Sequence, residues 1–228
     1  MIAVGTRLFP LVAAAVVAGC LGWALQPVRA ATSEFWLGTA APYVALALLG
    51  WALWRSAGGT LPEKLRWREV VRYRRGDASF SAPIGLVLVG AAWVLLHWFT
   101  EPGSLPRAWV FRLALVASGI RGVVPVLLLF LTAACEEVVW RGCAQSLLAS
   151  RFGPRKGWLL SSVLYAAAHF PAAQATADPE LGLNPVLPVS ALVLGLVTGA
   201  LVRWTGRLAP AVVTHFVFTY FGITWLLQ

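Results

Sequence analysis

Charged residues are scarce in this sequence. Lys, Arg, Asp and Glu make up 12% of the 228 residues, whereas a soluble domain carries roughly 25%. Hydrophobic residues reach 59%, there are 12 tryptophans, and the mean hydropathy is +0.77. This composition excludes an ordinary soluble globular protein and predicts a chain that crosses a membrane several times.

Other features are also missing. The three cysteines, Cys20, Cys135 and Cys143, form no CxxC pair and are interpreted as small packing residues. No HExxH occurs, which excludes the zinc-binding helix of the zincin proteases. There are no repeats or low-complexity tracts. The net charge of +9 comes from residues between apolar runs, so it indicates membrane orientation and not a nucleic-acid partner.

Seven apolar runs follow one another along the chain, at 8–26, 35–54, 80–99, 122–150, 157–174, 188–203 and 208–227. A helix needs roughly 20 residues to cross a bilayer. We therefore expect an all-α fold, a polytopic bundle of seven or eight transmembrane helices in a single membrane domain over 1–228. The first run, ending near "VRAA", could also be a signal peptide cleaved after Ala30.

The basic residues predict the orientation of the bundle. The loop after the second run is mainly basic, with Arg55, Lys64, Arg66, Arg68, Arg72, Arg74 and Arg75 against Glu63, Glu69 and Asp77. The positive-inside rule places this loop, and hence the N-terminus, in the cytoplasm, as expected in a prokaryotic cytoplasmic membrane. The segments 151–156 and 203–207 then lie inside as well, and Asp178 and Glu180 lie outside.

One segment does not fit the series of spans. The segment 109–121 carries Arg112 and Arg121, which would be costly in hydrocarbon unless they were paired. It is predicted to be an interfacial or re-entrant helix on the outer side. The alternative is an eighth span.

Polar residues from three separate runs reach similar depths. Counted from the cytoplasmic end at 1.5 Å per residue, Glu136 lies about 22 Å deep, His169 about 20 Å, His215 about 12 Å and Thr219 about 18 Å. A carboxylate at such depth is costly unless it is paired, hydrated or protonated. One carboxylate facing imidazoles around a water molecule is suited to general-base attack on a carbonyl group.

The two adjacent glutamates differ in their expected partners. Glu137 and Arg141 stand at i and i+4, so they can form an ion pair on one helix face. Glu136 lies about 100° around the helix and must find water, a histidine or a proton. Alternatively, both glutamates and Arg141 mark a helix end at the membrane interface. The segment "GLVTG" at 195–199 is a small-residue face typical of helix packing.

Nucleophilic catalysis has weaker support. Ser161 and Ser162 precede His169 by about two turns, and Cys135 adjoins an acid that would keep it a thiol. A proton-coupled transporter could use the same polar groups as a relay. It would be expected to show inverted repeats, and none is found.

The polar residues resemble the motifs of the CaaX-protease and bacteriocin-processing family of intramembrane endopeptidases, which includes the type II CaaX prenyl endopeptidases. That family shows EExxxR, FxxxH and HxxxN or HxxxD on separate transmembrane helices. Here the motifs read "EEVVWR" (136–141), "YAAAH" (165–169) and "HFVFT" (215–219). Tyr165 replaces Phe, and Thr219 replaces Asn or Asp. The resemblance covers about 120–228, whereas the spans within 1–105 carry no motif.

The resemblance implies a glutamate-dependent endopeptidase with a polar cavity open to the cytoplasmic side. Glu136 would activate water, His169 would help to hold it, and Glu137 and Arg141 would orient the site. The substrate would be a membrane-associated protein or peptide, cut near a CaaX-like C-terminus or sorting signal, or in a leader peptide.

The third motif would stabilise the transition state. His215 and Thr219 would bind the developing oxyanion, where each hydrogen-bond donor is worth ~2.7–4 kcal/mol. A threonine hydroxyl has a shorter reach than an asparagine amide, so the substitution also admits a non-catalytic immunity or scaffold protein with the same fold. No cofactor is expected. The alternative is a zinc ion held by Glu136, His169 and His215.

Overall fold

The computed structural model describes residues 2–30, 32–56, 72–117, 122–177, 180 and 182–225, which form helices and no β-strand. The helices are α1 (Ile2–Ala24), η1 (Pro27–Arg29), α2 (Ser33–Ser56), α4 (Asp77–Trp98), α5 (Leu105–Ala117), α6 (Val123–Glu137), η2 (Val138–Ala144), α7 (Gln145–Phe152), α8 (Pro154–Ala168), α9 (Phe170–Ala175), α10 (Val186–Thr205) and α11 (Ala209–Trp225). Some residues used to predict orientation lie outside the described residues: Glu63, Lys64, Arg66, Arg68, Glu69, Arg121 and Asp178.

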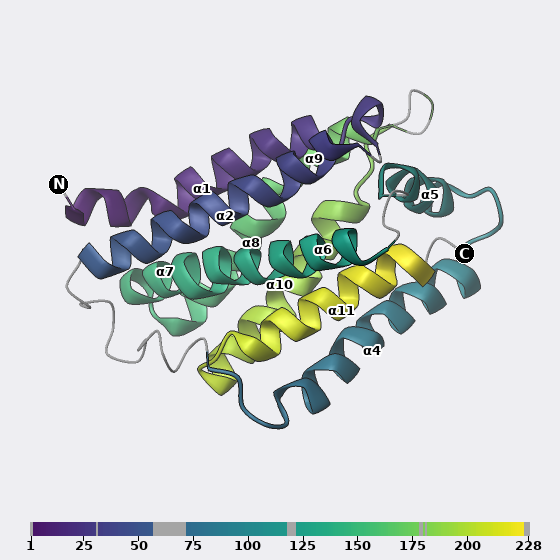
Figure 1. The fold of residues 1–228 in the computed structure, drawn as a ribbon. Helices are drawn as coiled ribbons and strands as arrows, with labels where there is room; N and C mark the ends of the chain where they lie inside the picture. The colour runs from purple at the N-terminus through teal and green to yellow at the C-terminus, as the bar shows by residue number, and fades with distance from the viewer. Residues whose placement is uncertain are drawn as a thin grey trace.

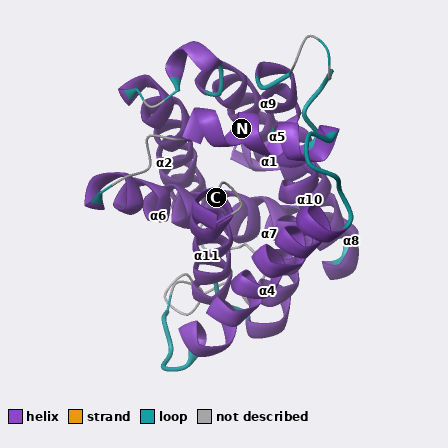
Figure 2. Cartoon of the chain, turned by 90° about the vertical axis from the view of Figure 1, so that its right-hand side faces the viewer, coloured by secondary structure: helices purple, strands orange, loops and turns teal. Residues whose placement is uncertain are grey.

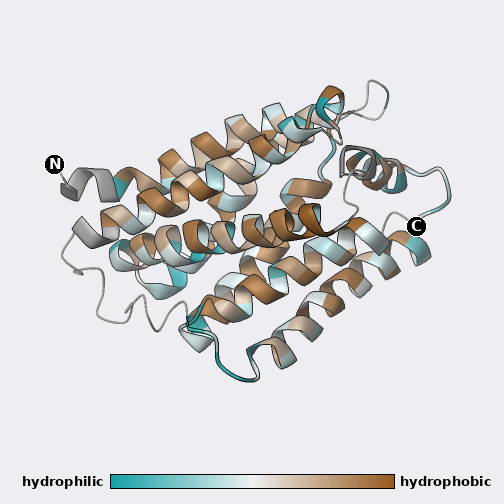
Figure 3. Cartoon of the chain, in the orientation of Figure 1, coloured by the Kyte–Doolittle hydropathy of each residue, from teal (hydrophilic) through white to brown (hydrophobic). Residues whose placement is uncertain are grey.

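The long helices lie side by side in one bundle (Figure 1). α1 and α2 form an antiparallel hairpin, α7 and α8 form another, and α11 packs against α4, α6 and α10. Hydrophobic residues also cover the outside of the bundle (Figure 3), where Leu48, Val87 and Leu95 are exposed. An apolar exterior of this kind is suited to contact with lipid.

Five helices are long and apolar enough to cross a membrane: 7–24 in α1, 33–53 in α2, 77–98 in α4, the continuous helix 123–152, and 186–205 in α10. The chain is therefore an integral membrane protein. The other two predicted spans are shorter. α8 has 15 residues because its helix breaks at His169, and the described part of α11 has 17.

The segment 109–121 falls largely within the short helix α5. The helix α5 has 13 residues and extends about 20 Å, less than a bilayer core of roughly 30 Å. Arg112 donates a hydrogen bond to the carbonyl oxygen of Ala177 at 2.8 Å, so its charge is held by protein. The described part of this segment is not among the helices long and apolar enough to cross a membrane, and residues 118–121 lie outside the described residues. The choice between an interfacial helix and an eighth span therefore stays a prediction.

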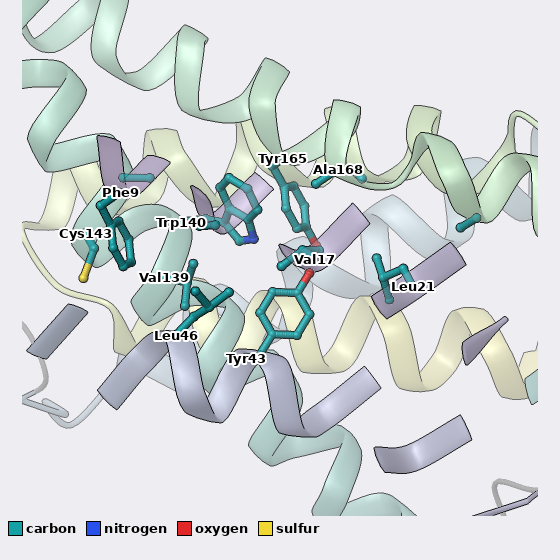
Figure 4. Close-up of a cluster of buried hydrophobic side chains, with 14 of the residues drawn as sticks. Phe9, Val17, Leu21, Tyr43, Leu46, Val139, Trp140, Cys143, Tyr165 and Ala168 are labelled. Carbon is teal, nitrogen blue, oxygen red and sulfur yellow. The ribbon is translucent and has the colours of Figure 1, made fainter. Parts of the chain in front are cut away.

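The hydrophobic core lies where the α1–α2 hairpin meets the helices that carry the first two motifs (Figure 4). Val17 and Tyr43 from the hairpin pack with Trp140 and Tyr165. Lipid is as apolar as these side chains, so they stabilise the bundle through close packing and not through removal from water. The first apolar run, considered above as a signal peptide, thus supplies part of the core.

The α7–α8 hairpin depends on two glycines. Gly153 has a φ of 85°, a conformation that favours glycine, and Pro154 begins α8 directly after it. Gly157 lies so close to Ala149 that a β-carbon would overlap the Ala149 backbone. The two helices can touch only because Gly157 has no side chain.

We expect Gly157→Ala to destabilise the bundle by about 1–3 kcal/mol, since overpacking forces the helices apart. Thermal unfolding in detergent measures the change. Gly90→Ala in α4 is the matched control, because the space around Gly90 is open and alanine favours a helix by about 1 kcal/mol. Equal melting temperatures for the two variants would contradict the close contact.

Candidate active site

The structure brings all six predicted site residues into one region of the bundle. Glu136 and Glu137 end α6, Arg141 lies in η2, His169 follows α8, and His215 and Thr219 stand one turn apart in α11. Four of them line a common cavity: Glu136, His169, His215 and Thr219. Glu137 and Arg141 are buried beside it, so residues up to 83 positions apart in sequence meet as the depth argument predicted.

Glu136 is buried but lines the cavity. Its Oε2 accepts a hydrogen bond from the Tyr165 hydroxyl at 2.7 Å, and Nε2 of His215 lies 3.9 Å from the same oxygen. The carboxylate takes no part in the neighbouring ion pair, as predicted. His215 is a histidine neighbour of the expected kind, whereas the hydrogen bond from Tyr165 was not predicted.

Glu137 is the centre of a buried charged network. Its Oε2 lies 3.3 Å from Nε of Arg141, which confirms the predicted i, i+4 pair. Its Oε1 accepts a hydrogen bond from Nδ1 of His215 at 2.8 Å, a link that the sequence did not predict. Glu137 is 0% exposed, so this network is closed to solvent and fixes the orientation of the His215 ring.

Arg141 joins three helices around that network. Its Nε donates a hydrogen bond to the Thr198 hydroxyl of α10 at 2.8 Å. Its guanidinium lies over the Tyr165 ring, 4.5 Å from the ring centre, in a cation–π contact. A single buried cation therefore connects η2 with α8 and α10.

The wide turn η2 positions these groups. Residues 138–144 form a π-helical turn inside the continuous helix 123–152, where an α-helix was predicted. In this π-helical turn the backbone hydrogen bonds of an α-helix are interrupted, so backbone carbonyl oxygens can bind other groups. The Ser161 hydroxyl donates a hydrogen bond to one of them, the Trp140 carbonyl oxygen, at 2.9 Å. Such turns occur frequently at functional sites.

His169 stands at a break between α8 and α9. Its backbone has φ −90° and ψ −4°, and Pro171 follows in the first turn of α9, where proline is tolerated. Nδ1 lies 2.7 Å from the Tyr165 carbonyl oxygen, so it carries the hydrogen of the neutral ring. Nε2 is left as an acceptor for a group in the cavity.

The cavity lined by Glu136, His169, His215 and Thr219 has a volume of about 220 Å³. Leu, Val, Ile, Phe and Trp side chains from α1, α2, α5, α6, α10 and α11 supply most of its wall. Among the described residues, Glu136 is the one carboxylate or basic side chain other than histidine that lines it. The cavity was predicted to be polar; it is instead apolar, with the acid and the imidazoles at its inner end.

The cavity leads away from the basic segments. From Glu136 its wall continues toward the N-terminus of α6 and the C-terminus of α11. The opposite end of the bundle, where α7 and α10 end and α11 begins (Figure 1), carries Arg151, Arg203 and Arg207. The described lining therefore lies between Glu136 and the end opposite the basic segments, whereas the predicted cytoplasmic cavity was expected to lead toward them.

Tyr43 of α2 is a candidate that the motifs did not indicate. It is 1% exposed and lines the cavity, and its hydroxyl lies close to the Glu136 carboxylate and the Trp140 indole. Figure 4 shows this hydroxyl directed at that of Tyr165. The only signal in the sequence was one phenol within an apolar run.

The alternative nucleophiles are not at the site. Ser161 and Ser162 donate their hydroxyl hydrogens to backbone carbonyls of Trp140 and Trp158. Cys135 does not line the cavity. These side chains are explained by helix packing.

The zinc alternative requires Glu136, His169 and His215 to converge on one point. Within the described ranges, no group of three or more His, Cys, Asp and Glu side chains is arranged to hold a metal ion. The Nδ1 atoms of both histidines are bonded to oxygen atoms of Tyr165 and Glu137, which leaves both Nε2 atoms, as in histidines that bind a metal. The zinc alternative therefore stays a prediction.

Comparison with known proteins agrees with the motifs. No curated protein and no solved structure shows significant similarity to this chain. Residues 121–221, a segment that contains all six predicted site residues, match the family model described as type II CAAX prenyl endopeptidase Rce1-like. This segment is therefore similar to the Rce1-like type II CAAX prenyl endopeptidases, a family of membrane proteases.

Proposed function

We propose that this protein is an intramembrane endopeptidase in which Glu136 activates water to hydrolyse a peptide bond of a membrane-associated protein or peptide. One observation carries the proposal. Of two adjacent buried carboxylates, Glu137 is held by Arg141 and His215, whereas Glu136 lines the cavity and takes no part in an ion pair with arginine. A carboxylate in that position can accept a proton.

The base and the water would be positioned by neighbours of Glu136. Nε2 of His169 would accept one hydrogen of the water, and Glu136 would take the other as the oxygen attacks the carbonyl carbon. The Tyr165 hydroxyl, 2.7 Å from Oε2, would hold the carboxylate in the required rotamer. Glu136 would then return its proton to the amide nitrogen that leaves.

His215 and Thr219 would stabilise the oxyanion. The bond from Nδ1 to Glu137 orients Nε2 of His215 toward Glu136 and the cavity. In its protonated form His215 would donate from Nε2, and Thr219, one turn further along α11, would donate its hydroxyl hydrogen. Arg141 and Glu137 act as positioning residues because they lie behind this surface.

The proposal includes a topology. Seven crossings result if α8 with α9, and α11, are added to the five long helices, with the N-terminus in the cytoplasm. The basic segments of the chain support this orientation. No cofactor is required by the proposed chemistry.

Glu136→Gln should abolish cleavage while the protein remains folded, because the amide still accepts the Tyr165 hydrogen bond but cannot take a proton. Comparison of membrane proteomes with and without the protein identifies altered C-terminal or leader peptides. Glu101→Gln, in an exposed loop, is the control and should behave as wild type. Full biological activity of Glu136→Gln would favour the non-catalytic scaffold.

Glu137→Gln should destabilise the protein by roughly 3–5 kcal/mol, since it leaves the Arg141 cation buried without a counter-charge. The same substitution at Glu136 should change the stability little. Thermal unfolding of both variants in one detergent compares them. Equal melting temperatures would refute the division of roles between the two acids.

Thr219→Val should lower the single-turnover cleavage rate by about 10²–10³-fold, the usual effect of losing one oxyanion donor. Thr219→Asn, which introduces the residue usual in the family, should keep or increase the rate. Thr224→Val on the same helix serves as control, because Thr224 does not line the cavity and bonds to the Tyr220 carbonyl. A wild-type rate for Thr219→Val would remove this residue from the mechanism.

A further inference from the structure

The two ends of the bundle differ in charge. At one end, called here the basic end, α1, α4, α8 and α11 begin and α7 and α10 end (Figure 1). By their positions in or next to these helix ends, the basic residues there are Arg7, Arg72, Arg74, Arg75, Arg151, Arg155, Lys156, Arg203 and Arg207. The one acidic side chain at the basic end in the described part of the chain is Asp77, whose Oδ1 lies 2.8 Å from Nη2 of Arg207. That ion pair joins the start of α4 to the start of α11. Arg203 lies over the Trp158 ring, which joins the end of α10 to the start of α8 at the same level.

The opposite end, called here the neutral end, has balanced charge among the described residues. Arg29 pairs with Glu34 at 3.1 Å where α1 turns into α2. Arg107 donates hydrogen bonds to carbonyl oxygens at the end of α4, and Glu101 lies in the connecting loop. An excess of Lys and Arg at one end of a membrane bundle marks the cytoplasmic side. The neutral end is therefore extracytoplasmic.

The cavity wall extends from the catalytic cluster toward the neutral end on every long helix that lines it. On α6 it runs from Glu136 back to Leu129, and on α11 from His215 forward to Ile223. On α10 and α2 the lining residues likewise continue toward the N-terminal ends. Figure 2 looks onto the neutral end, where α1, α2, α6, α10 and α11 surround the centre.

Toward the basic end the cluster is backed by packed side chains. Trp140 and Cys143 belong to the hydrophobic core together with Phe9 of α1 (Figure 4). Arg141 bonds to Thr198, and the Gln145 amide donates to the Gly199 carbonyl oxygen at 3.2 Å. These contacts close the floor of the cavity on that side.

We propose that substrates reach Glu136 from the extracytoplasmic side of the membrane. The inference rests on the proposed function for the role of the cavity, whereas its direction rests on the charges and lining residues above. The substrates are then membrane-anchored polypeptides whose scissile bond lies at the extracytoplasmic end of the anchor. A protein attached only to the cytoplasmic leaflet cannot enter.

The cavity also limits the residues next to the scissile bond. From His215 to Ile223 the wall is about 12 Å deep, which accommodates three or four residues of extended chain. These residues are apolar and uncharged, because the described wall offers no cation and its one carboxylate is the base. Lys or Asp at those substrate positions should prevent cleavage.

Cysteine labelling in intact cells tests the direction of access without any need for activity. In a full-length chain with Cys20, Cys135 and Cys143 replaced by alanine, single cysteines are introduced as Glu101→Cys, Ser190→Cys or Ser150→Cys. Ser190 lines the cavity, whereas Ser150 is exposed beside Arg151 at the basic end. A membrane-impermeant thiol reagent should label Glu101→Cys and Ser190→Cys in intact cells, and Ser150→Cys only after permeabilisation.

Two results would overturn the proposal. One is labelling of Ser150→Cys, and not Glu101→Cys, in intact cells, because the bundle would then have the reverse orientation. The other is labelling of Ser190→Cys that requires permeabilisation or fails in both preparations, because the cavity would then not open outward.

Cleavage of reporter substrates by the unmodified protein tests the direction of access independently. Two reporters carry the same apolar anchor and tag in opposite orientations, so the cleavable end is extracytoplasmic in one and cytoplasmic in the other. The wild type, and not Glu136→Gln, should cut only the first. Cutting of only the second overturns the access route. Cutting of neither counts against the protease function, and the labelling then decides the direction alone.

Discussion

The ion pair between Arg141 and Glu137 is the interaction on which the site depends. Two adjacent carboxylates in an apolar bundle are tolerable only if at least one is neutralised by a partner. Arg141 provides that partner, and its contacts with Thr198 and the Tyr165 ring fix it between helices. Glu136 can then face the cavity as the one carboxylate in its described wall, while Glu137 orients His215.

Helix packing in turn makes that ion pair possible. Thr198 stands between Gly195 and Gly199, and a β-carbon on Gly199 would overlap Trp158 and the Gln145 side chain. These glycines allow α10 to approach the hairpin closely enough for Thr198 to accept the hydrogen bond from Arg141. The small-residue face predicted from "GLVTG" is thus confirmed as a packing surface, and it supports the polar network directly.

The sequence predicted the parts of the structure that follow from apolar length and residue spacing. Most apolar runs became long helices, and the depth comparison correctly joined Glu136, His169 and His215. The sequence could not predict the π-helical turn, because that turn depends on tertiary contacts such as the hydrogen bond from the Ser161 hydroxyl to the Trp140 carbonyl oxygen. The depth comparison also did not predict the hydrogen bond between His215 and Glu137, because side-chain rotamers, and not depth, determine which atoms come within hydrogen-bond distance.

The cavity wall comes from more of the chain than the catalytic cluster does. The segment 121–221 contains the acids and imidazoles, whereas Leu21, Phe35 and Tyr43 of the first hairpin, together with α5, form much of the opposite wall. The first hairpin and α5 therefore shape one side of the cavity without contributing any of the six motif residues, while α6, α10 and α11 form most of the rest of the wall. Substitutions in the first hairpin can change the shape of the cavity while the polar residues at its inner end stay untouched.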